Sequence, residues 1–355
     1  MTRVRRILLA ARASLLLAPL LLASLVFGRA TAATPQFALD RSIPIAGPVK
    51  WDYLTLEQGT HRLFATEGDR VAVIDTATSK QIGTIAPVEG AHGIALAPRL
   101  DRGFATAGIA GTVTMFNLRT LEKLAVIDVG EGPDAIAYDP ASQRVLVPNE
   151  KSQTLFVIAA RTGKIVGQIP FHADPEFIVV DGKGLAYLNL NSADQIAVVN
   201  THTLRITRRI AVGPTCHGPT GLAIDQTQGR LFVSCRNHVV DVVDAPTGKL
   251  LATLPIPAFC DAMRFDPSQN LAFAPSVDGT LTVIGAEGPQ GYKIVQRVTT
   301  APSARTMVFD QATQTAYLSV ANIMKMLPPS GDRHYPKPVF APGSFHILVV
   351  SEVKD

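Results

Sequence analysis

The chain has 355 residues, of which 47% are hydrophobic and only 17% are charged. Its formal net charge of +4 comes from 33 basic and 29 acidic residues. Five of the arginines and none of the acids lie in the first 32 residues, which leaves 28 basic residues against 29 acidic ones. A near-neutral chain lacks the bulk positive charge that drives non-specific nucleic-acid binding, so charge gives no reason to expect a nucleic-acid partner.

Residues 1–32 have the features of a signal peptide. Arginines precede an apolar run over residues 15–27, and the small residues 30–32 form a cleavage site. The apolar run is shorter than the roughly 20 residues of a membrane-spanning helix, which favours cleavage over an uncleaved anchor. We therefore expect a mature chain from Ala33, periplasmic or secreted and without a stable membrane anchor. The sequence leaves open whether it is exported by the general or the twin-arginine route.

A fifteen-residue phrase recurs seven times after this segment, at a spacing of 40 to 44 residues. The copies begin at Asp52, His92, Asp134, Glu176, Thr220, Asp261 and Arg305. A period of about 40–45 residues with several short apolar strands per unit is typical of a β-propeller blade. The sequence thus predicts an all-β fold, with residues 33–355 forming a single seven-bladed propeller domain that we expect to be monomeric.

The unit that begins at His92 illustrates how one repeat forms a four-stranded antiparallel blade. Residues 92–98, 103–108, 112–118 and 122–130 predict the strands from the innermost to the outermost. Between the third and fourth strands, several repeats place Asp or Asn three residues before Thr, and such side chains close turns by bonding nearby backbone amides. The pairs are Asp75/Thr78, Asn117/Thr120, Asn200/Thr203 and Asp244/Thr247.

The seventh unit lacks a fourth strand of its own. Its third strand is predicted from Ser344, and the chain ends soon afterwards. Residues 37–47, by contrast, resemble an outer strand without a blade. We expect this N-terminal strand to pair onto the C-terminal blade, because closure of the ring removes the exposed strand edges of an open sheet.

Three phrases, at residues 70–85, 111–140 and 221–237, resemble the YVTN-repeat, YncE-like family of bacterial exported seven-bladed β-propellers. The resemblance covers essentially the whole mature chain. It implies the propeller fold and export, but no particular activity, because propellers support many unrelated functions. Related propeller groups include lactonases and metal-dependent lyases, which resemble this chain in fold more than in motif.

The first residues of the seven repeats are expected to surround one mouth of the central channel. We predict a ligand-binding ring there, which comprises Asp52, His92, Asp134, Glu176, Thr220, Asp261 and Arg305. Trp51 adjoins this ring, and it either stacks on a ligand or packs in the wall. Converging carboxylates raise one another's pKa unless a cation or arginine offsets them. Oxygen ligands with one imidazole suit Ca²⁺, Mg²⁺, Mn²⁺ or Zn²⁺, and the candidate metal ligands are Asp52, Asp134, Glu176 and Asp261.

Three functional classes remain open from the sequence. The first is a non-catalytic protein that binds a small ligand, a metal ion or a partner at this mouth. The second is a metal-dependent lactonase or lyase, with His92 and Glu176 as candidate catalytic residues. The third is a protein-interaction platform, which would show a large apolar patch on a rim. Alternatively, the ring has no binding function, and its polar side chains are only solvated and paired with one another.

Cysteines add a second feature to the same face. Cys216 precedes the fifth blade and Cys235 ends its second strand, so an oxidising exported setting favours a disulfide between them. Cys260 is left over and is expected to be a buried structural thiol. A Cys/His metal cluster that uses His217 or His238 is the alternative, although no recognised metal-ligand spacing supports it.

Residues 321–343 interrupt the seventh blade between its second and third strands. The segment contains five prolines, which favour an extended and stiff conformation over a helix. Loops of this length are uncommon unless they are functional or disordered. Two interpretations are open: a partial lid beside Arg305, or a passive surface loop.

Overall fold

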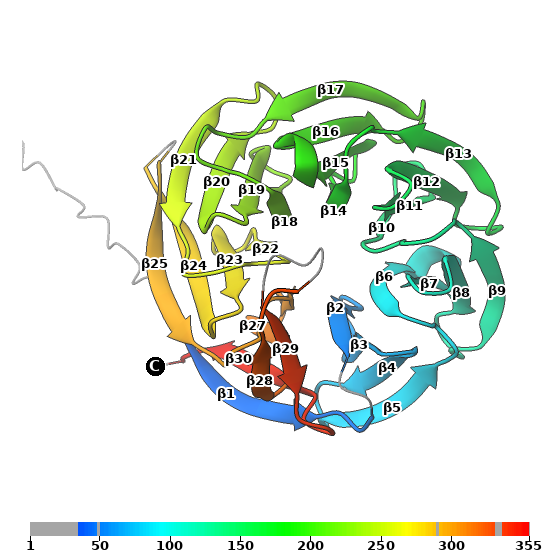
Figure 1. The fold of residues 1–355 in the computed structure, drawn as a ribbon, viewed down its shortest axis with the longest axis horizontal. Coiled ribbons are helices and arrows are strands. Elements are labelled where there is room, and N and C mark those ends of the chain that lie inside the picture. Colours follow the sequence, from blue (N-terminus) through cyan, green and yellow to red (C-terminus); the bar gives the residue numbers. More distant parts are fainter. Residues whose placement is uncertain (1–34, 48–49, 289–290, 331–335, 355) are drawn as a thin grey trace, which may run out of the picture. The chain divides into compact units, whose positions relative to one another are not determined.

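The structure is a computed structural model that describes residues 35–47, 50–288, 291–330 and 336–354. These residues form seven four-stranded antiparallel sheets, arranged as blades around a central channel (Figure 1). Two short 3-10 turns, Pro98–Leu100 and Asn191–Ala193, are the only helical elements in the described ranges. None of the described residues belongs to a helix long and apolar enough to cross a membrane. The expected signal peptide, residues 1–32, lies outside the described residues.

Each blade is built from an innermost, a second, a third and an outer strand. The innermost strands are β2 (Trp51–Leu56), β6 (Ala91–Ala97), β10 (Ala137–Asp139), β14 (Pro175–Val180), β18 (Pro219–Asp225), β22 (Arg264–Asp266) and β26 (Met307–Asp310). The second strands are β3 (Arg62–Glu67), β7 (Arg102–Ala107), β11 (Arg144–Asn149), β15 (Leu185–Leu190), β19 (Arg230–Cys235), β23 (Leu271–Ser276) and β27 (Thr315–Val320).

The two remaining strands of each blade lie towards the rim. The third strands are β4 (Arg70–Asp75), β8 (Thr112–Asn117), β12 (Thr154–Ala159), β16 (Gln195–Asn200), β20 (Val239–Asp244), β24 (Thr280–Glu287) and β30 (His346–Glu352). The outer strands are β5 (Lys80–Ile85), β9 (Lys123–Asp128), β13 (Ile165–Pro170), β17 (Arg205–Ala211), β21 (Leu250–Pro255), β25 (Gly291–Thr299) and β1 (Phe37–Pro44). This arrangement confirms the predicted all-β, seven-bladed propeller.

The middle strands of a blade are buried on both faces. In β3, for example, Leu63, Phe64 and Ala65 are fully buried, because each blade packs against a neighbour on either side. Outer strands such as β5 are mostly exposed. Burial on both faces explains why these segments read as continuous apolar runs rather than as alternating patterns.

The expected turn-closing role of the Asp and Asn residues is confirmed. In each of the four turns, the backbone N–H of the threonine donates to the Oδ1 atom of the residue three positions earlier. The N···O distance is 2.8 Å for Thr78, Thr120 and Thr203 and 2.9 Å for Thr247. These polar residues therefore have a local structural role.

The first and last described strands meet in the seventh blade, as predicted. Strand β1 pairs antiparallel with β30, from Phe37 opposite Glu352 to Pro44 opposite His346. Phe37 is 2% exposed, and its ring meets Phe273 edge-on with 5.1 Å between ring centroids. The N-terminal strand thus supplies both the missing outer strand and part of the core.

Candidate functional site

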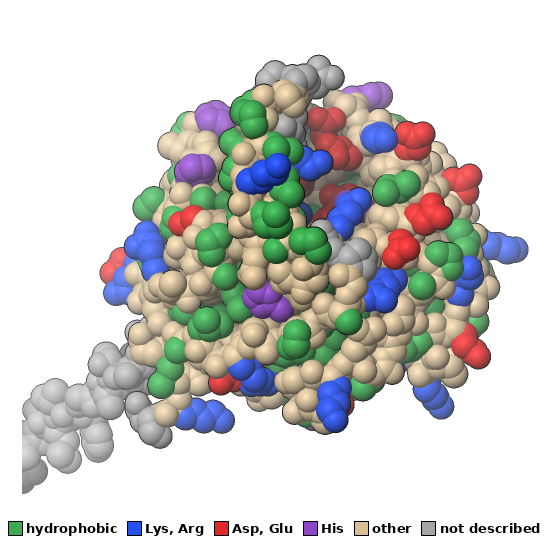
Figure 2. Space-filling view, turned by 60° about the horizontal axis from the view of Figure 1, so that its bottom comes forward, with side chains coloured by type: hydrophobic (Ala, Val, Ile, Leu, Met, Phe, Trp, Pro, Cys, Tyr) green, Lys and Arg blue, Asp and Glu red, His purple; other side chains and the backbone are tan. Residues whose placement is uncertain are grey.

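A cavity of about 680 Å³ occupies the mouth of the central channel where the repeats begin. Five of the seven ring residues line it: Asp52, Asp134, Glu176, Asp261 and Arg305. Other lining residues include Tyr53, Arg236, Phe259, Ser303, Ile323, Met326, Pro338 and Phe340. Figure 2 shows acidic side chains within a hollow that hydrophobic and basic side chains partly screen.

Hydrogen bonds between blades fix the backbone of the ring residues. The Thr106 hydroxyl donates to the Asp134 carbonyl at 2.6 Å, and the Thr306 hydroxyl donates to the Asp52 carbonyl at 2.7 Å. The Asp261 N–H donates to the Arg305 carbonyl at 3.1 Å. Each bond crosses from one blade to the next, so ring closure also positions the charged side chains.

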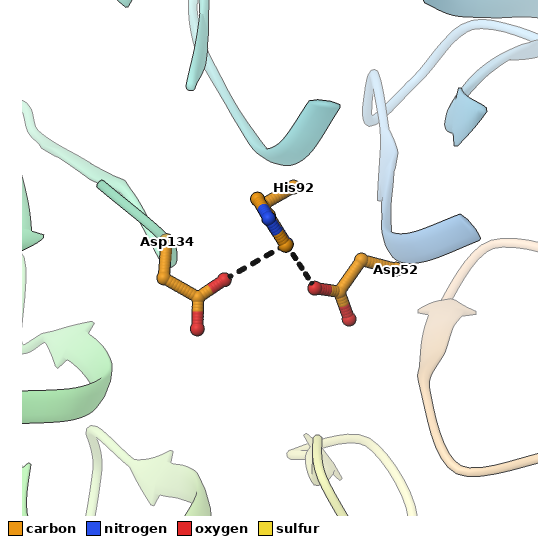
Figure 3. Close-up of side chains that lie close together, drawn as sticks. All are labelled: Asp52, His92 and Asp134. Carbon is orange, nitrogen blue, oxygen red and sulfur yellow. Dashed lines mark hydrogen bonds and ion pairs between the residues drawn. The ribbon is translucent and has the colours of Figure 1, made fainter. Parts of the chain in front are cut away.

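Asp52, His92 and Asp134 come from three successive blades and form one cluster (Figure 3). The His92 Nδ1 atom lies 2.6 Å from Asp52 Oδ2 and 3.3 Å from Asp134 Oδ1. One ligand atom from each residue lies within 4.8 Å of the others. The three side chains can therefore offer two carboxylate oxygens and one imidazole nitrogen to a single cation.

A glycine holds the imidazole in place. A Cβ atom at Gly108 would lie only 2.6 Å from His92 Cδ2 and 2.8 Å from Nε2, so the ring packs directly on this backbone. A side chain at position 108 would therefore displace the imidazole. Nδ1 is the nitrogen that faces the two carboxylates.

Arg305 bridges two other members of the ring. Its Nε donates to Asp261 Oδ2 at 2.8 Å, and one terminal nitrogen donates to Asp52 Oδ1 at 3.4 Å. Burial opposes the charged guanidinium, but Asp261 and Asp52 outweigh that effect and raise the pKa of Arg305. Arg305 is therefore a permanent cation, and it offsets only part of the negative charge at the mouth.

Glu176 faces the same cavity from the fourth blade. Burial, followed by the charges of Asp261 and Asp134, raises its pKa well above the usual range. Its nearest cation is Arg236, whose terminal nitrogen lies 3.9 Å from Glu176 Oε1. Arg236 also lies over the Phe259 ring, 5.9 Å from the ring centroid. The surroundings of Glu176 thus favour its protonated form over the carboxylate.

Two further candidates have other surroundings. Thr220 is fully buried, and its hydroxyl donates to the Cys260 carbonyl at 2.6 Å, so it lies outside the cavity lining. Trp51 packs between Phe340 and Phe345, with ring-centroid distances of 4.6 Å and 5.7 Å. Trp51 therefore packs in the wall of the channel mouth. The Thr220 hydroxyl links the fifth blade to the sixth through its hydrogen bond to Cys260.

The described part of the 321–343 segment contains two extended strands, β28 (Ile323–Leu327) and β29 (Lys337–Phe340), which pair as a hairpin. Ile323, Met326 and Phe340 line the cavity, while Met324 is 62% exposed on the same hairpin. The contact between Phe340 and Trp51 fastens the hairpin to the ring. The hairpin is therefore part of the cavity wall.

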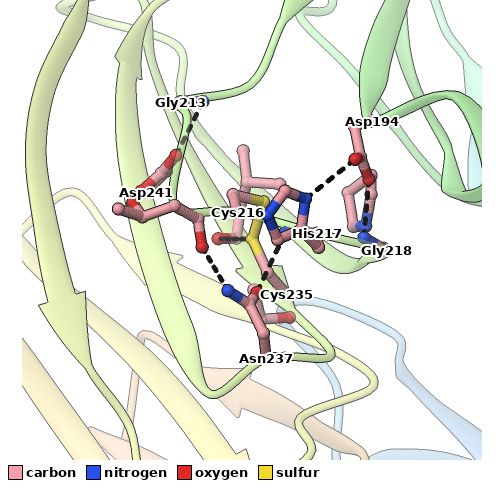
Figure 4. Close-up of a disulfide and its surroundings, with 12 residues drawn as sticks. Asp194, Gly213, Cys216, His217, Gly218, Cys235, Asn237 and Asp241 are labelled. Carbon is pink, nitrogen blue, oxygen red and sulfur yellow. Dashed lines mark hydrogen bonds and ion pairs between the residues drawn. A yellow bond between two sulfur atoms is a disulfide. The ribbon is translucent and has the colours of Figure 1, made fainter.

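The predicted disulfide between Cys216 and Cys235 is present (Figure 4). It holds the loop before β18 against the end of β19. Asp194 strengthens this junction, because its carboxylate accepts hydrogen bonds from His217 Nδ1 at 3.0 Å and from the Gly218 N–H at 2.7 Å. The junction places Arg236, the residue after Cys235, at the cavity.

Cys260 lies apart from this disulfide and is fully buried. Burial raises the pKa of its thiol to about 12. A thiol in this environment is poorly disposed to form the reactive thiolate.

Sequence reasoning missed four polar or aromatic residues of the cavity: Tyr53, Arg236, Phe259 and Ser303. None of them stands at the start of a repeat, so alignment of the repeats does not reveal them. Arg236 had an indirect signal, because it directly follows the half-cystine Cys235. Tyr53 directly follows Asp52, but an aromatic residue in an apolar strand reads as core.

Titration of the cluster gives a prediction for stability. Burial and then the charge of Asp52 raise the pKa of Asp134 to about 8, although His92 opposes this shift. Burial lowers the pKa of His92, but the hydrogen bond and charge of Asp52 and the charge of Asp134 outweigh it and raise the value to about 9. Lys50, Glu150 and Asp261 are the other charged groups that act on the pair.

Both groups bind protons more tightly in the folded chain than in the unfolded one. The melting temperature of the cation-free protein should therefore fall as the pH rises from about 6 to about 9. Asp134→Asn should reduce this dependence, since one of the two groups is then absent. Thermal unfolding followed by circular dichroism measures both effects, and a melting temperature that rises across this window would contradict the assignment.

Comparisons with known proteins define the class of the chain. No protein-family model matches it, and no curated protein matches its sequence. The solved structure titled "Structure of U3-55K" matches with a TM-score of 0.72 at 9% identity, over 87% of this chain and 97% of that chain. Identity this low shows the fold alone. The chain is a seven-bladed β-propeller protein.

Proposed function

We propose that the chain is an exported YVTN-repeat, YncE-like propeller that binds a divalent cation and a small ligand at its channel mouth. The repeat phrases support the family, and the disulfide supports an oxidising compartment. The observation that carries the binding proposal is the cluster of Asp52, His92 and Asp134, whose three ligand atoms lie within 4.8 Å of one another.

The electrostatics of the mouth favour a cation. Asp52, Asp134, Glu176 and Asp261 converge there, and burial raises the pKa of the last three. The buried Oδ1 atom of Asp134 lies 3.3 Å from His92 Nδ1 but accepts no hydrogen bond from the described residues. A divalent ion would bind this oxygen directly and would stabilise the ionised carboxylates.

The ligand set favours Zn²⁺ or Mn²⁺ over Ca²⁺. Two carboxylates and one imidazole provide three protein ligands, which leaves coordination positions open towards the cavity. Ca²⁺ prefers six to eight oxygen ligands, and the imidazole contributes none. The hairpin residues Ile323, Met326 and Phe340 give the rest of the cavity an apolar wall. The proposed ligand is a small molecule with an oxygen donor for the cation and an apolar body for this wall.

Calorimetric titration of the mature chain with Zn²⁺ or Mn²⁺ tests the proposal. We expect one ion per chain, with an affinity that increases with pH because His92 and Asp134 must lose protons to bind it. Asp134→Asn should weaken binding at least about 100-fold, since loss of second-shell partners alone costs about 10- to 100-fold. The matched control Asp69→Asn removes an exposed carboxylate outside the cavity and should leave the affinity unchanged. Absence of stoichiometric binding to the wild-type chain at about pH 8 would refute the cation site.

A second candidate function is a metal-dependent lactonase or lyase at the same mouth. Glu176 favours it, because a carboxyl with a raised pKa beside a cation site can act as a general acid. The cation would polarise a carbonyl group or activate water, and His92 would then be a ligand rather than an acid or base. At cation saturation, Glu176→Gln should abolish turnover of lactones while leaving cation binding intact. A chain that binds the cation but turns over no lactone would favour the binding function.

A further inference from the structure

A second cavity, of about 470 Å³, lies at the opposite end of the central channel. Gln226 and Thr227, which follow the end of β18, and Gln311, which follows the end of β26, are exposed at its rim. The channel mouth with the acidic ring, called the upper mouth from here on, lies at the start of the same strands. The second cavity therefore opens on the other face of the propeller. This second cavity is called the lower cavity.

Two aromatic rings stand between the cavities. Tyr53 lines the upper cavity and Phe177 lines the lower one, and their rings meet edge-on with 5.2 Å between centroids. Tyr53 is 5% and Phe177 is 7% exposed. The two cavities are thus separate, and a ligand in the lower one does not contact the acidic cluster.

Arg264, at the start of β22, projects into the lower cavity. Its guanidinium lies over the Phe177 ring, 5.7 Å from the centroid, and one terminal nitrogen donates to the Met263 carbonyl at 2.7 Å. Its other nitrogens make no hydrogen bond to any described residue, and no described carboxylate forms an ion pair with it. Arg305 at the upper mouth, by contrast, contacts two carboxylates.

Arg264 is half-buried and has no ion-pair partner among the described residues. Loss of hydration lowers the pKa of its guanidinium to about 10. Folded proteins normally pair such a group with a carboxylate or with a bound anion. No carboxylate of the described chain serves here, so the missing partner is expected to come from a ligand.

The walls of the lower cavity indicate the rest of that ligand. Ile136, Val179 and Val180 supply partly exposed apolar side chains. The innermost strands also present their unpaired backbone edges to the channel (Figure 1). A ligand with an anionic group would pair with the guanidinium of Arg264. A short apolar body on the same ligand would contact the apolar side chains.

We propose that the lower cavity binds a small organic carboxylate, with Arg264 as its anion-binding residue. The planar guanidinium presents its free donors in the geometry that a carboxylate accepts. Phe177 supports the guanidinium from its face. This site is independent of the cation site at the upper mouth.

Calorimetric titration with hexanoate at constant ionic strength tests the site. The wild-type chain should bind one hexanoate, and Arg264→Gln should weaken binding about tenfold or more, because it removes charge-assisted hydrogen bonds. The control Arg119→Gln removes an exposed arginine away from the cavity and should bind normally. Asp134→Asn should also bind hexanoate normally, since it alters only the upper mouth. Equal binding by the wild-type chain and Arg264→Gln, or no binding by either, would overturn the proposal.

A stability measurement distinguishes a ligand-binding arginine from a structural one. In anion-poor buffer, Arg264→Met should melt at a higher temperature than the wild-type chain, because it removes a half-buried charge that has no ion-pair partner. A lower melting temperature would show that Arg264 stabilises the fold, and it would overturn the proposal. Tighter binding of inorganic phosphate than of hexanoate would overturn the assignment to a carboxylate.

Discussion

Removal of strand β1 is expected to abolish cooperative folding of the propeller. A chain that begins at Ala46 would lose the pairing with β30 and the buried side chains of Phe37, Ile43 and Ile45. Burial of three large apolar side chains contributes about 5–9 kcal/mol, at about 1.5–3 kcal/mol each. The whole stability of a typical domain is about 5–15 kcal/mol, so the loss is comparable with the total.

A single substitution provides a graded version of this test. Phe37→Ala should lower the free energy of unfolding by about 3–5 kcal/mol, because the ring is buried between Phe273 and Phe309. Leu39→Ala on the same strand is the matched control, since Leu39 is 46% exposed, and it should change stability by less than about 0.5 kcal/mol. Urea denaturation measures both. Equal denaturation midpoints for Phe37→Ala and the wild-type chain would contradict the closure mechanism.

Arg305→Met is expected to destabilise the protein strongly at neutral pH and weakly in acid. The substitution leaves Asp52 and Asp261, each 7% exposed, without their shared cation. Breaking a buried ion pair from one side costs about 3–5 kcal/mol. We expect about 3 kcal/mol here, because the Arg305 side chain is itself 27% exposed.

The pH dependence of this variant follows from Asp261. Burial already raises the pKa of Asp261 in spite of Arg305, and removal of the guanidinium raises it further. Stability is then retained at low pH, where Asp261 is protonated, and is lost as the pH rises. Urea denaturation at about pH 5 and about pH 8 should therefore show a larger difference from the wild-type chain at the higher pH. A loss that is equal at both pH values would contradict the ion-pair explanation.

Cation binding separates this effect from simple misfolding. Arg305→Met removes positive charge near Asp52, so the folded variant should bind Zn²⁺ more tightly than the wild-type chain. Arg119→Met, which changes an exposed arginine, should alter neither stability nor cation affinity. Weaker Zn²⁺ binding by folded Arg305→Met would mean that Arg305 organises the cation site rather than competing with it.

Most of the fold follows from repetition in the sequence. Each unit carries the same strands and turns, and residues 37–47 read as an outer strand because the last unit lacks one. The disulfide was also predictable, since both half-cystines fall on the same face of one blade. The hairpin within residues 321–343 was not, because prolines indicate an extended chain but do not reveal which residues pair.

The candidate site was only partly predictable. Alignment of the repeat starts predicted a common ring, and the structure brings five of its residues to one cavity. Thr220 departs from this pattern because its short hydroxyl reaches the backbone carbonyl of the next blade instead. Arg236 and Arg264 enter the channel from positions that the alignment does not mark. Their roles depend on how neighbouring blades pack, which the repeat pattern does not encode.

The most direct test of the cation site is a crystal structure of the mature protein grown with Zn²⁺ at about pH 8. Anomalous scattering at the zinc edge should give one strong peak between Asp52, His92 and Asp134. We expect distances of about 2.0–2.2 Å from the ion to His92 Nδ1 and to the two carboxylate oxygens. A mouth without a peak, or zinc found only at surface histidines, would contradict the account.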